Sequence, residues 1–429
     1  MEQKTNNNNS HLSRRLGLLT TTLVGIGVIL GAGIYVLVGV AARQAGNAAW
    51  MSFLIAAVVA GFTGLSYARL SKMKPKNAPE FQYLNMAFGR APAFLAGWLV
   101  LGSTVISAAV VALGFAGYLE HLFGIPYLGG AIGLILLSSL VVFMGIGEST
   151  VFAAVLTLVE VGGILIIIFI GIPSFGRVDI FEMPEAGLSG VIGAASLIFF
   201  AYLGFEGMAN MSEEMKNPQR DLPKALLLAI TISTILYILV AISAVSVIGW
   251  QNLSASSAPL AAVAAEVIGD KADILLTAIA LASTANTVIL LLFAASRSMW
   301  AMSCAGVLPK NICVIGEHRH TPWLAILLVG AIACIFTLFK SIEDVAEFTN
   351  FAVLLAFIGV NASAFKLFTR DATTGRIKHI LMNRIMPLLG CITSLWLAIT
   401  LGWRAAVFGL ILLSAGIAFY FLMKRIYRN

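Results

Sequence analysis

The chain has 429 residues, of which 59% are hydrophobic and only 11% are charged. Soluble domains carry roughly 25% charged residues, so this composition excludes a soluble protein and indicates an integral membrane protein. The formal net charge of +7 fits basic loops facing anionic lipid headgroups. We therefore expect the lipid bilayer as a partner, and no nucleic acid.

Apolar runs of about 20 residues recur along the chain, which is the length that an α-helix needs to cross the hydrocarbon core. Transmembrane β-strands would be about half as long and would alternate in polarity. The sequence predicts an all-α integral membrane protein with about 12 transmembrane helices. The spans are expected near residues 17–42, 47–69, 91–118, 126–145, 150–172, 189–210, 225–248, 273–303, 322–339, 345–368, 385–402 and 404–423, with a very tight turn around Trp403.

Lysine and arginine are distributed unevenly over the predicted loops. With both termini inside, 22 of the 27 Lys and Arg residues lie on the inner side, and the outer side holds Arg43, Arg177, Lys271, Lys340 and Arg404. The positive-inside rule predicts such a bias. We expect a multi-pass protein of the cell membrane with cytoplasmic tails at residues 1–15 and 424–429.

Two stretches of the chain are organised alike. Residues 16–172 hold five predicted spans, and residues 189–368 hold five more. Each set begins with a hydrophobic run that is interrupted by glycine. Because an odd number of spans separates them, the two sets have opposite orientations, which predicts a 5+5 inverted repeat. The two spans in residues 385–423 lie outside that repeat.

The first interrupted run contains glycine at positions 25, 27, 31 and 33. Glycine weakens a helix by about 1 kcal/mol relative to alanine, so the helix is expected to unwind at Gly31–Gly33. The half-helix that starts there would offer free N–H groups to an anion such as a carboxylate. The alternative is close packing of this helix against another through its small residues.

The second interrupted run is Phe199–Gly204, in the sixth predicted span. A half-helix that ends there would present free carbonyl groups, which favour a cation such as an α-ammonium group. The two breaks together would suit a zwitterion. The alternative is a bent, aromatic-rich helix in which Gly204 serves packing.

Two acidic residues lie within predicted spans. Glu160 falls near the middle of the fifth span, where a carboxylate should face the bundle interior or water. It is a candidate proton-responsive group, or else a neutral acid hydrogen-bonded between helices. Glu206 follows the second break, where it would either hold free backbone N–H groups or take part in coupling. Ser283 and Thr284 lie in the eighth span, where hydroxyls usually bond back to their own helix.

No cofactor and no metal site are expected from this sequence. The four cysteines, Cys304, Cys313, Cys334 and Cys391, form no CxxC pair. Cysteine in a membrane helix usually acts as a small apolar residue, so no disulfide is expected either.

Between spans, residues 71–90 contain Pro75, Pro79 and Tyr83 and predict a short interfacial helix.

Several segments resemble one transporter family. Phe199–Glu206, followed by Glu213–Pro223, is similar to the sixth-span signature of the amino acid–polyamine–organocation superfamily. Gly31–Leu37 resembles the first-span break of its cationic amino acid transporter branch, and Gly64–Leu70 and Ala295–Arg297 also look like family segments. The resemblance covers residues 12–370 in order and implies the leucine-transporter-like fold.

The resemblance also implies a site by position. The substrate carboxylate would meet the amides of Gly31, Ala32 and Gly33. Its amino group would meet the carbonyls of Ile29, Phe200, Ala201 and Leu203, with Phe200 as a candidate aromatic lid. The sodium-like position of this fold would fall on the carbonyls of Gly27 and Leu30 and the hydroxyls of Ser283 and Thr284.

The chain departs from the family pattern at two places. Many relatives have lysine where this chain has Glu160, so a carboxylate takes the place of an ammonium group. Relatives usually have a Gly-Gly pair where this chain has Asn77-Ala78-Pro79. Because a carboxylate cannot replace the lysine directly but could bind a proton, the first departure favours coupling of transport to protons. The second leaves the backbone geometry before the third span unpredicted.

The sequence therefore predicts a secondary active transporter that moves amino acids by alternating access with proton coupling. The alternatives are an amino acid/polyamine exchanger without net proton coupling and a non-transporting amino acid sensor. A membrane enzyme is not expected, because there is no HExxH motif and all five histidines fall in tails or loops. Neutral amino acids suit the apolar breaks, whereas cationic amino acids or polyamines would suit Glu160 and Glu206. Either a monomer or a homodimer is expected.

Overall fold

A computed structural model describes residues 15–256, 258–269, 271–316, 319–338, 342–370 and 380–426. Within these ranges the chain is helical throughout, apart from turns, extended connections and one isolated parallel bridge between Leu16 and Met215. The elements, in chain order, are α1 (Leu18–Ala45), η1 (Gly46–Ala48), α2 (Ala49–Met73), α3 (Pro79–Phe88), α4 (Arg90–Phe123), α5 (Tyr127–Met144), α6 (Ile146–Gly171), η2 (Ile172–Ser174), α7 (Leu188–Ile198), η3 (Phe199–Tyr202), η4 (Glu206–Glu214), α8 (Pro218–Ala255), α9 (Pro259–Ile268), α10 (Lys271–Cys304), η5 (Lys310–Ile312), α11 (Trp323–Phe336), α12 (Ile342–Arg370), η6 (Leu381–Ile385), α14 (Met386–Thr400) and α15 (Gly402–Ile426).

Eleven segments of the described chain are long and apolar enough to cross a membrane. The protein is thus a multi-pass, all-helical membrane protein. The ninth expected span, residues 322–339, instead forms α11, which has only 14 residues and falls short of a full crossing. The tight turn before the last helix falls at Leu401 and Gly402, where Gly402 has a φ of 86°, and Trp403 already belongs to α15.

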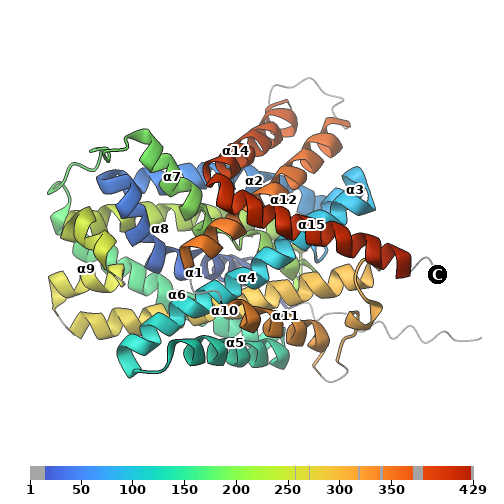
Figure 1. Cartoon of the computed structure of the whole chain (residues 1–429), viewed down its shortest axis with the longest axis horizontal. Helices are drawn as coiled ribbons and strands as arrows, with labels where there is room; N and C mark the ends of the chain where they lie inside the picture. Colours follow the sequence, from blue (N-terminus) through green and yellow to red (C-terminus); the bar gives the residue numbers. More distant parts are fainter. Residues whose placement is uncertain are drawn as a thin grey trace, which may run out of the picture.

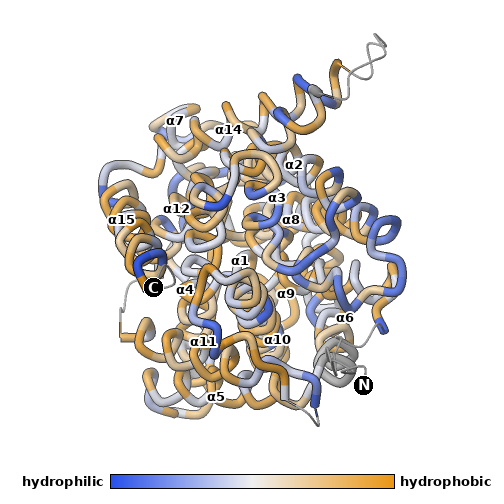
Figure 2. The backbone as a smooth tube through the Cα atoms, turned by 90° about the vertical axis from the view of Figure 1, so that its right-hand side faces the viewer, coloured by the Kyte–Doolittle hydropathy of each residue, from blue (hydrophilic) through white to orange (hydrophobic). Residues whose placement is uncertain are grey.

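Helix α1 lies in the middle of the bundle, where it packs against α6, α8 and α10 (Figure 1). Helices α14 and α15 lie to one side, with α14 against α12 and α15 against α4 and α12. The tube coloured by hydropathy is apolar along most of the helices (Figure 2). The right-hand end of the bundle in Figure 1 contains α3 and the last turn of α15, which holds Lys424 and Arg425, and we call it the basic end. Helices α7 and α9 lie at the opposite end.

The segment between α2 and α4 contains the expected short helix, α3, but this helix is not superficial. Glu80 and Tyr83 are fully buried, and Phe81 nearly so. Ala78, just before the helix, has a φ of 54° and donates its N–H to Asn210 Oδ1 at 2.8 Å. Left-handed backbone favours glycine, so the departure from Gly-Gly at this position places an alanine in a conformation that alanine rarely adopts.

The expectation of no disulfide is wrong for one pair of cysteines. Cys304 ends α10 and Cys313 follows η5, and the turn between them returns the chain so that their Cα atoms lie 4.9 Å apart. That separation falls in the range that a disulfide requires, and the two residues are joined. A sequence spacing of nine residues does not reveal this return of the chain.

Candidate substrate and coupling site

The first break lies inside α1, as the glycine pattern predicts. Gly31 has φ 11° and ψ −145°, which interrupts the helical conformation. A Cβ atom added to Gly31 would lie 2.1 Å from Thr287 Oγ1 on α10. Glycine is therefore needed here for the close approach of α10.

The second break separates α7 from η4. After η3, Leu203 is extended and Gly204 has a φ of 111°. The N–H group of Gly204 donates to Glu206 Oε2 at 2.9 Å, so the carboxylate holds a backbone group that the break has freed. Beyond it, the second half of this span is a nine-residue 3₁₀ helix, longer than 3₁₀ runs usually are.

The two breaks lie directly against each other. A Cβ added to Gly33 would lie 2.5 Å from Ala201 Cβ, and one added to Gly204 would lie 2.0 Å from Val28 Cγ1. The small residues thus serve close packing between α1 and the η3 region, which was the alternative explanation for them. This packing also brings the amides of one break and the carbonyls of the other into one region.

Tyr237 of α8 links the two breaks and was not among the residues predicted from the sequence. Its hydroxyl donates to the carbonyls of Ile29 and of Ala201, the latter at 2.9 Å, and lies 3.4 Å from the carbonyl oxygen of Leu30. Ile29 and Ala201 are two of the four carbonyls expected to meet an ammonium group. The available signal was a tyrosine in the middle of a predicted span, where its hydroxyl needs a buried partner.

The other expected residues of this region differ in their surroundings. The carbonyl of Phe200 accepts the N–H of Leu203 at 3.1 Å, so it closes a turn. Phe199 is fully buried and packs edge-on against Phe357, whereas Phe200 keeps 8% of its surface exposed. The side chain of Ala32 lies outside the described part of the structure.

Glu160 lies where α6 meets α1 and α10. It is fully buried, and its Oε1 accepts the hydroxyl of Ser283. Its Oε2 has no hydrogen-bond partner among the described residues, although the side chain of Asn286 lies near the carboxylate. The backbone carbonyl of Glu160 accepts the Tyr35 hydroxyl at 3.2 Å, which ties α6 to α1.

The polar groups around Glu160 only partly match the expected set. Thr287 Oγ1 lies 3.4 Å from the carbonyl oxygen of Gly27 and donates to the carbonyl of Ser283 at 3.1 Å. Thr284 instead bonds back to Ala280 at 2.7 Å, as helical hydroxyls commonly do. The structure therefore brings Gly27, Ser283 and Glu160 together and supplies Thr287 in place of Thr284.

The chain closes the basic end of this region with backbone hydrogen bonds. The N–H groups of Arg15 and Leu16 donate to the carbonyl of Glu214 at 2.9 and 3.0 Å, and that of Lys216 donates to Leu16 at 2.9 Å. Beneath them, the buried Arg297 lies 3.6 Å from Glu214 and over the ring of Phe293. These contacts tie the segment before α1 to the end of η4.

A further buried acid lies between the membrane spans, on α3. Glu80 Oε1 accepts the hydroxyl of Tyr67 at 2.6 Å, and its Oε2 has no partner among the described residues. Burial, with a smaller contribution from the nearby Glu206, raises the pKa of the Glu80 carboxyl to about 8. Glu80 was not among the residues predicted from the sequence, because its segment was expected at the membrane surface.

Two broken helices that meet in the middle of a multi-pass bundle are typical of one class of protein, the secondary membrane transporters. Within that class, the chain belongs to the amino acid permease family, whose profile matches residues 16–424. The family consists of transporters, so the protein is a permease and not an enzyme. Membership implies the leucine-transporter-like fold.

Individual relatives match along nearly the whole chain. The branched-chain amino acid permease BcaP of Bacillus subtilis is 25% identical over 96% of this chain and 94% of its own length. The methylthioribose transporter of the same organism is 29% identical over 96% of this chain and 94% of its own length. The human cationic amino acid transporter 4 is 30% identical over 83% of this chain and 60% of its own length.

Proposed function

We propose that this permease is a secondary active transporter that moves a neutral amino acid across the cell membrane by alternating access, coupled to protons. In this proposal residues 16–172 and 189–368 form the two inverted repeats of five spans each. The short α11 counts as the ninth of twelve spans, and residues 385–423 add the last two. Both tails lie in the cytoplasm in this proposal.

The substrate would bind at the junction of the two breaks. The amides of residues 31–33 would meet its carboxylate, and the carbonyls of Ile29 and Ala201 would meet its ammonium group. The contact between Gly33 and Ala201 supports this placement, because it brings the amides of the first break and the carbonyls of the second close enough to bind the two charges of one small zwitterion. The Tyr237 hydroxyl would give up its two carbonyl partners to the incoming ammonium group.

The residues that line the junction of the two breaks indicate which substrate side chain the site would accept. Ile29, Phe200 and Leu203 are apolar and at least nine-tenths buried, which suits an apolar side chain. The branched-chain relative supports this substrate class, while the cationic and methylthioribose relatives mark the alternatives. A cationic substrate would need an acidic partner, and Glu206 already accepts a hydrogen bond from the Gly204 backbone.

The observation on which proton coupling rests is the position of Glu160. A fully buried carboxyl with one oxygen on Ser283 and the other without a partner is suited to gain and lose a proton. Because its neighbours come from α1 and α10, a change of its charge would act on the packing of three helices. Those helices would then shift between the outward-open and inward-open states.

The test is uptake of labelled leucine and arginine into proteoliposomes, with and without an imposed pH gradient. We expect a gradient that is acidic outside to drive leucine accumulation in the wild type. Glu160→Gln should retain leucine binding and lose this dependence on the gradient. Glu266→Gln, an exposed acid on α9, serves as the matched control and should behave as the wild type.

Other outcomes distinguish the alternatives. Uptake that needs internal substrate and ignores the pH gradient would indicate an exchanger. Binding of leucine without any flux would indicate a sensor. An unchanged pH profile in Glu160→Gln would contradict the coupling assignment and move it to Glu206.

A further inference from the structure

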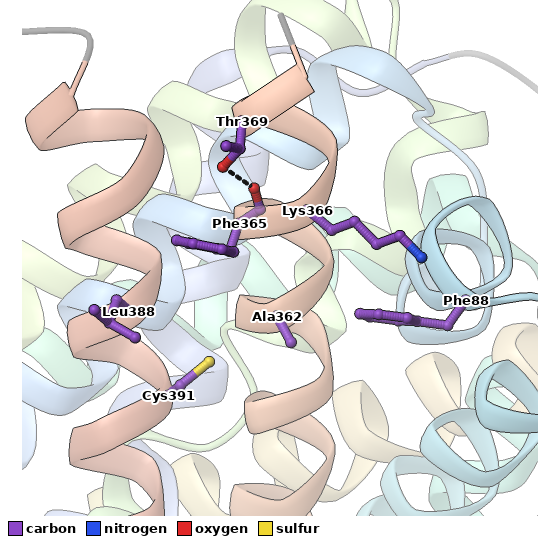
Figure 3. A pocket seen from close by; sticks show the side chains of 7 residues that line it. All are labelled: Phe88, Ala362, Phe365, Lys366, Thr369, Leu388 and Cys391. Atoms are coloured by element: carbon purple, nitrogen blue, oxygen red, sulfur yellow. Dashed lines mark hydrogen bonds between the residues drawn. The ribbon is translucent and has the colours of Figure 1, made fainter. Parts of the chain in front are cut away.

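A groove on the side of the bundle lies apart from the candidate site. It has a volume of about 580 Å³ and opens between α12, α14 and the end of α3 (Figure 3). Its walls are almost entirely apolar. They consist of Ala362, Phe365, Lys366 and Thr369 of α12, and Leu388 and Cys391 of α14, with Phe88 of α3 at the far edge.

The apolar walls of the groove face away from the protein core. Phe88, Phe365 and Leu388 are 42%, 37% and 49% exposed, although all three are large hydrophobic residues. In a membrane-spanning bundle, an exposed apolar surface of this kind is covered by lipid acyl chains. The groove is therefore a lipid-facing recess.

One cation stands at the edge of this recess. The Lys366 side chain reaches across the opening toward Phe88, and its ammonium nitrogen lies 4.6 Å from the ring centroid (Figure 3). No carboxylate forms an ion pair with Lys366 within the part of the chain that the structure describes. A cation–π contact leaves most of the ammonium group able to meet an anion.

The position along the helices places this cation near the membrane surface. Lys366 lies in the last two turns of α12, which ends at Arg370. Leu388 lies in the first turn of α14, and the exposed Arg384 precedes it by four residues. Lysine and arginine near the ends of membrane helices extend toward the headgroup layer, so the charged edge and the apolar wall match the two parts of a phospholipid.

We propose that this groove is a binding site for an anionic phospholipid, with the phosphate at Lys366 and one acyl chain along Phe365 and Leu388. Charge complementarity favours an anionic lipid over a zwitterionic one, because a zwitterionic headgroup brings its own cation beside Lys366. The apolar wall favours a lipid over a free phosphate ester, which would leave Phe365 and Leu388 exposed. The site is independent of the transported substrate and of the coupling ion.

The test is binding of phosphatidylglycerol and phosphatidylcholine to the detergent-purified protein, counted by native mass spectrometry and checked by thermal unfolding. We expect phosphatidylglycerol to bind more tightly and to raise Tm more, since a ligand of the folded state stabilises it. Lys366→Gln should weaken phosphatidylglycerol binding about fivefold, the factor for one lysine near an anionic surface. Lys366→Arg should retain it.

Lys424→Gln is the matched control, because Lys424 is an exposed lysine in the last turn of α15 and does not line the groove. Its phosphatidylglycerol affinity should equal that of the wild type. Equal loss in Lys424→Gln and Lys366→Gln, or equal binding of the two lipids, would overturn the proposal. Competition by glycerol phosphate at the affinity of the whole lipid would also overturn it, since the acyl chain would then contribute nothing.

Discussion

Replacing Tyr237 by phenylalanine removes a hydroxyl that joins the two helix breaks. The hydroxyl donates to the carbonyls of Ile29 and Ala201, and both residues are almost completely buried. A buried hydrogen bond contributes about 0.5–1.5 kcal/mol net, and an acceptor left without a partner adds a desolvation cost. Loss of this hydrogen bond, whose single proton is shared between two buried carbonyls, should therefore lower the free energy of unfolding by about 1–3 kcal/mol.

The assay is a denaturant titration in detergent micelles, with and without the amino acid that stabilises the wild-type protein most. In Tyr237→Phe, the two carbonyls no longer have a competing hydroxyl, so the ammonium group of the substrate replaces the lost partner. The stability gained on adding substrate should then be larger in Tyr237→Phe than in the wild type.

Tyr202→Phe is the matched control, because the Tyr202 ring packs against Tyr237 and its hydroxyl donates to the carbonyl of Phe53 at 3.1 Å. It should lose about 0.5–1.5 kcal/mol of stability and gain as much from substrate as the wild type does. An apo stability of Tyr237→Phe equal to that of the wild type would refute the bridging role. A substrate gain that is unchanged or smaller would refute the displacement of the hydroxyl by an ammonium group.

Three further predictions concern single positions. Gly33→Ala should abolish uptake into proteoliposomes, because its Cβ would lie 2.6 Å from Ala201 Cα and force the breaks apart. Gly162→Ala has open space around its Cβ and should transport normally. Equal uptake by the two variants would contradict the close contact of the two breaks at the substrate site. Phe200→Ala should reduce uptake more than Phe199→Ala at equal expression, and equal small effects would exclude a lid. Because the folded Glu80 has a pKa of about 8 against a usual 4.5, the folded state binds more protons between these values, so stability should fall as pH rises from 4.5 to 8. Glu80→Gln should flatten this part of the pH profile of unfolding, and a profile that keeps its slope would assign the effect to another group.

The positions of the helix breaks could be predicted from the sequence because their causes are local. Glycine at positions 31 and 204 weakens the helix locally, and the structure has the two interruptions there. The partner of these breaks could not be predicted in the same way. Tyr237 is 208 residues from Ile29 in the sequence, and only the packing of α8 against α1 brings the two together.

The polar residues around Glu160 could be predicted only in part, because the sequence does not give the rotation of a helix about its own axis. Ser283 and Thr287 are four residues apart and face α6 and α1 together, while Thr284 is turned toward its own helix. The residue predicted from the sequence was Thr284, the chain neighbour of Ser283, whereas Thr287 lies one helical turn further along. The rotation of α10 is set by its contacts with neighbouring helices. One of these contacts is the hydrogen bond from the Asn286 side chain to the Thr157 hydroxyl on α6, at 3.1 Å.

The paired backbone segments at the basic end have a mechanical consequence. Arg15 and Leu16 precede α1 and are joined by three backbone hydrogen bonds to Glu214, the last residue of η4, and to Lys216, so this pairing acts as a latch between the start of α1 and the end of the second broken span. At about 1 kcal/mol each, the three bonds bias the latched over the released state by roughly two orders of magnitude. A force on the segment before Leu16, from a fused tag or a bound protein, would therefore set how often this end of the permease opens.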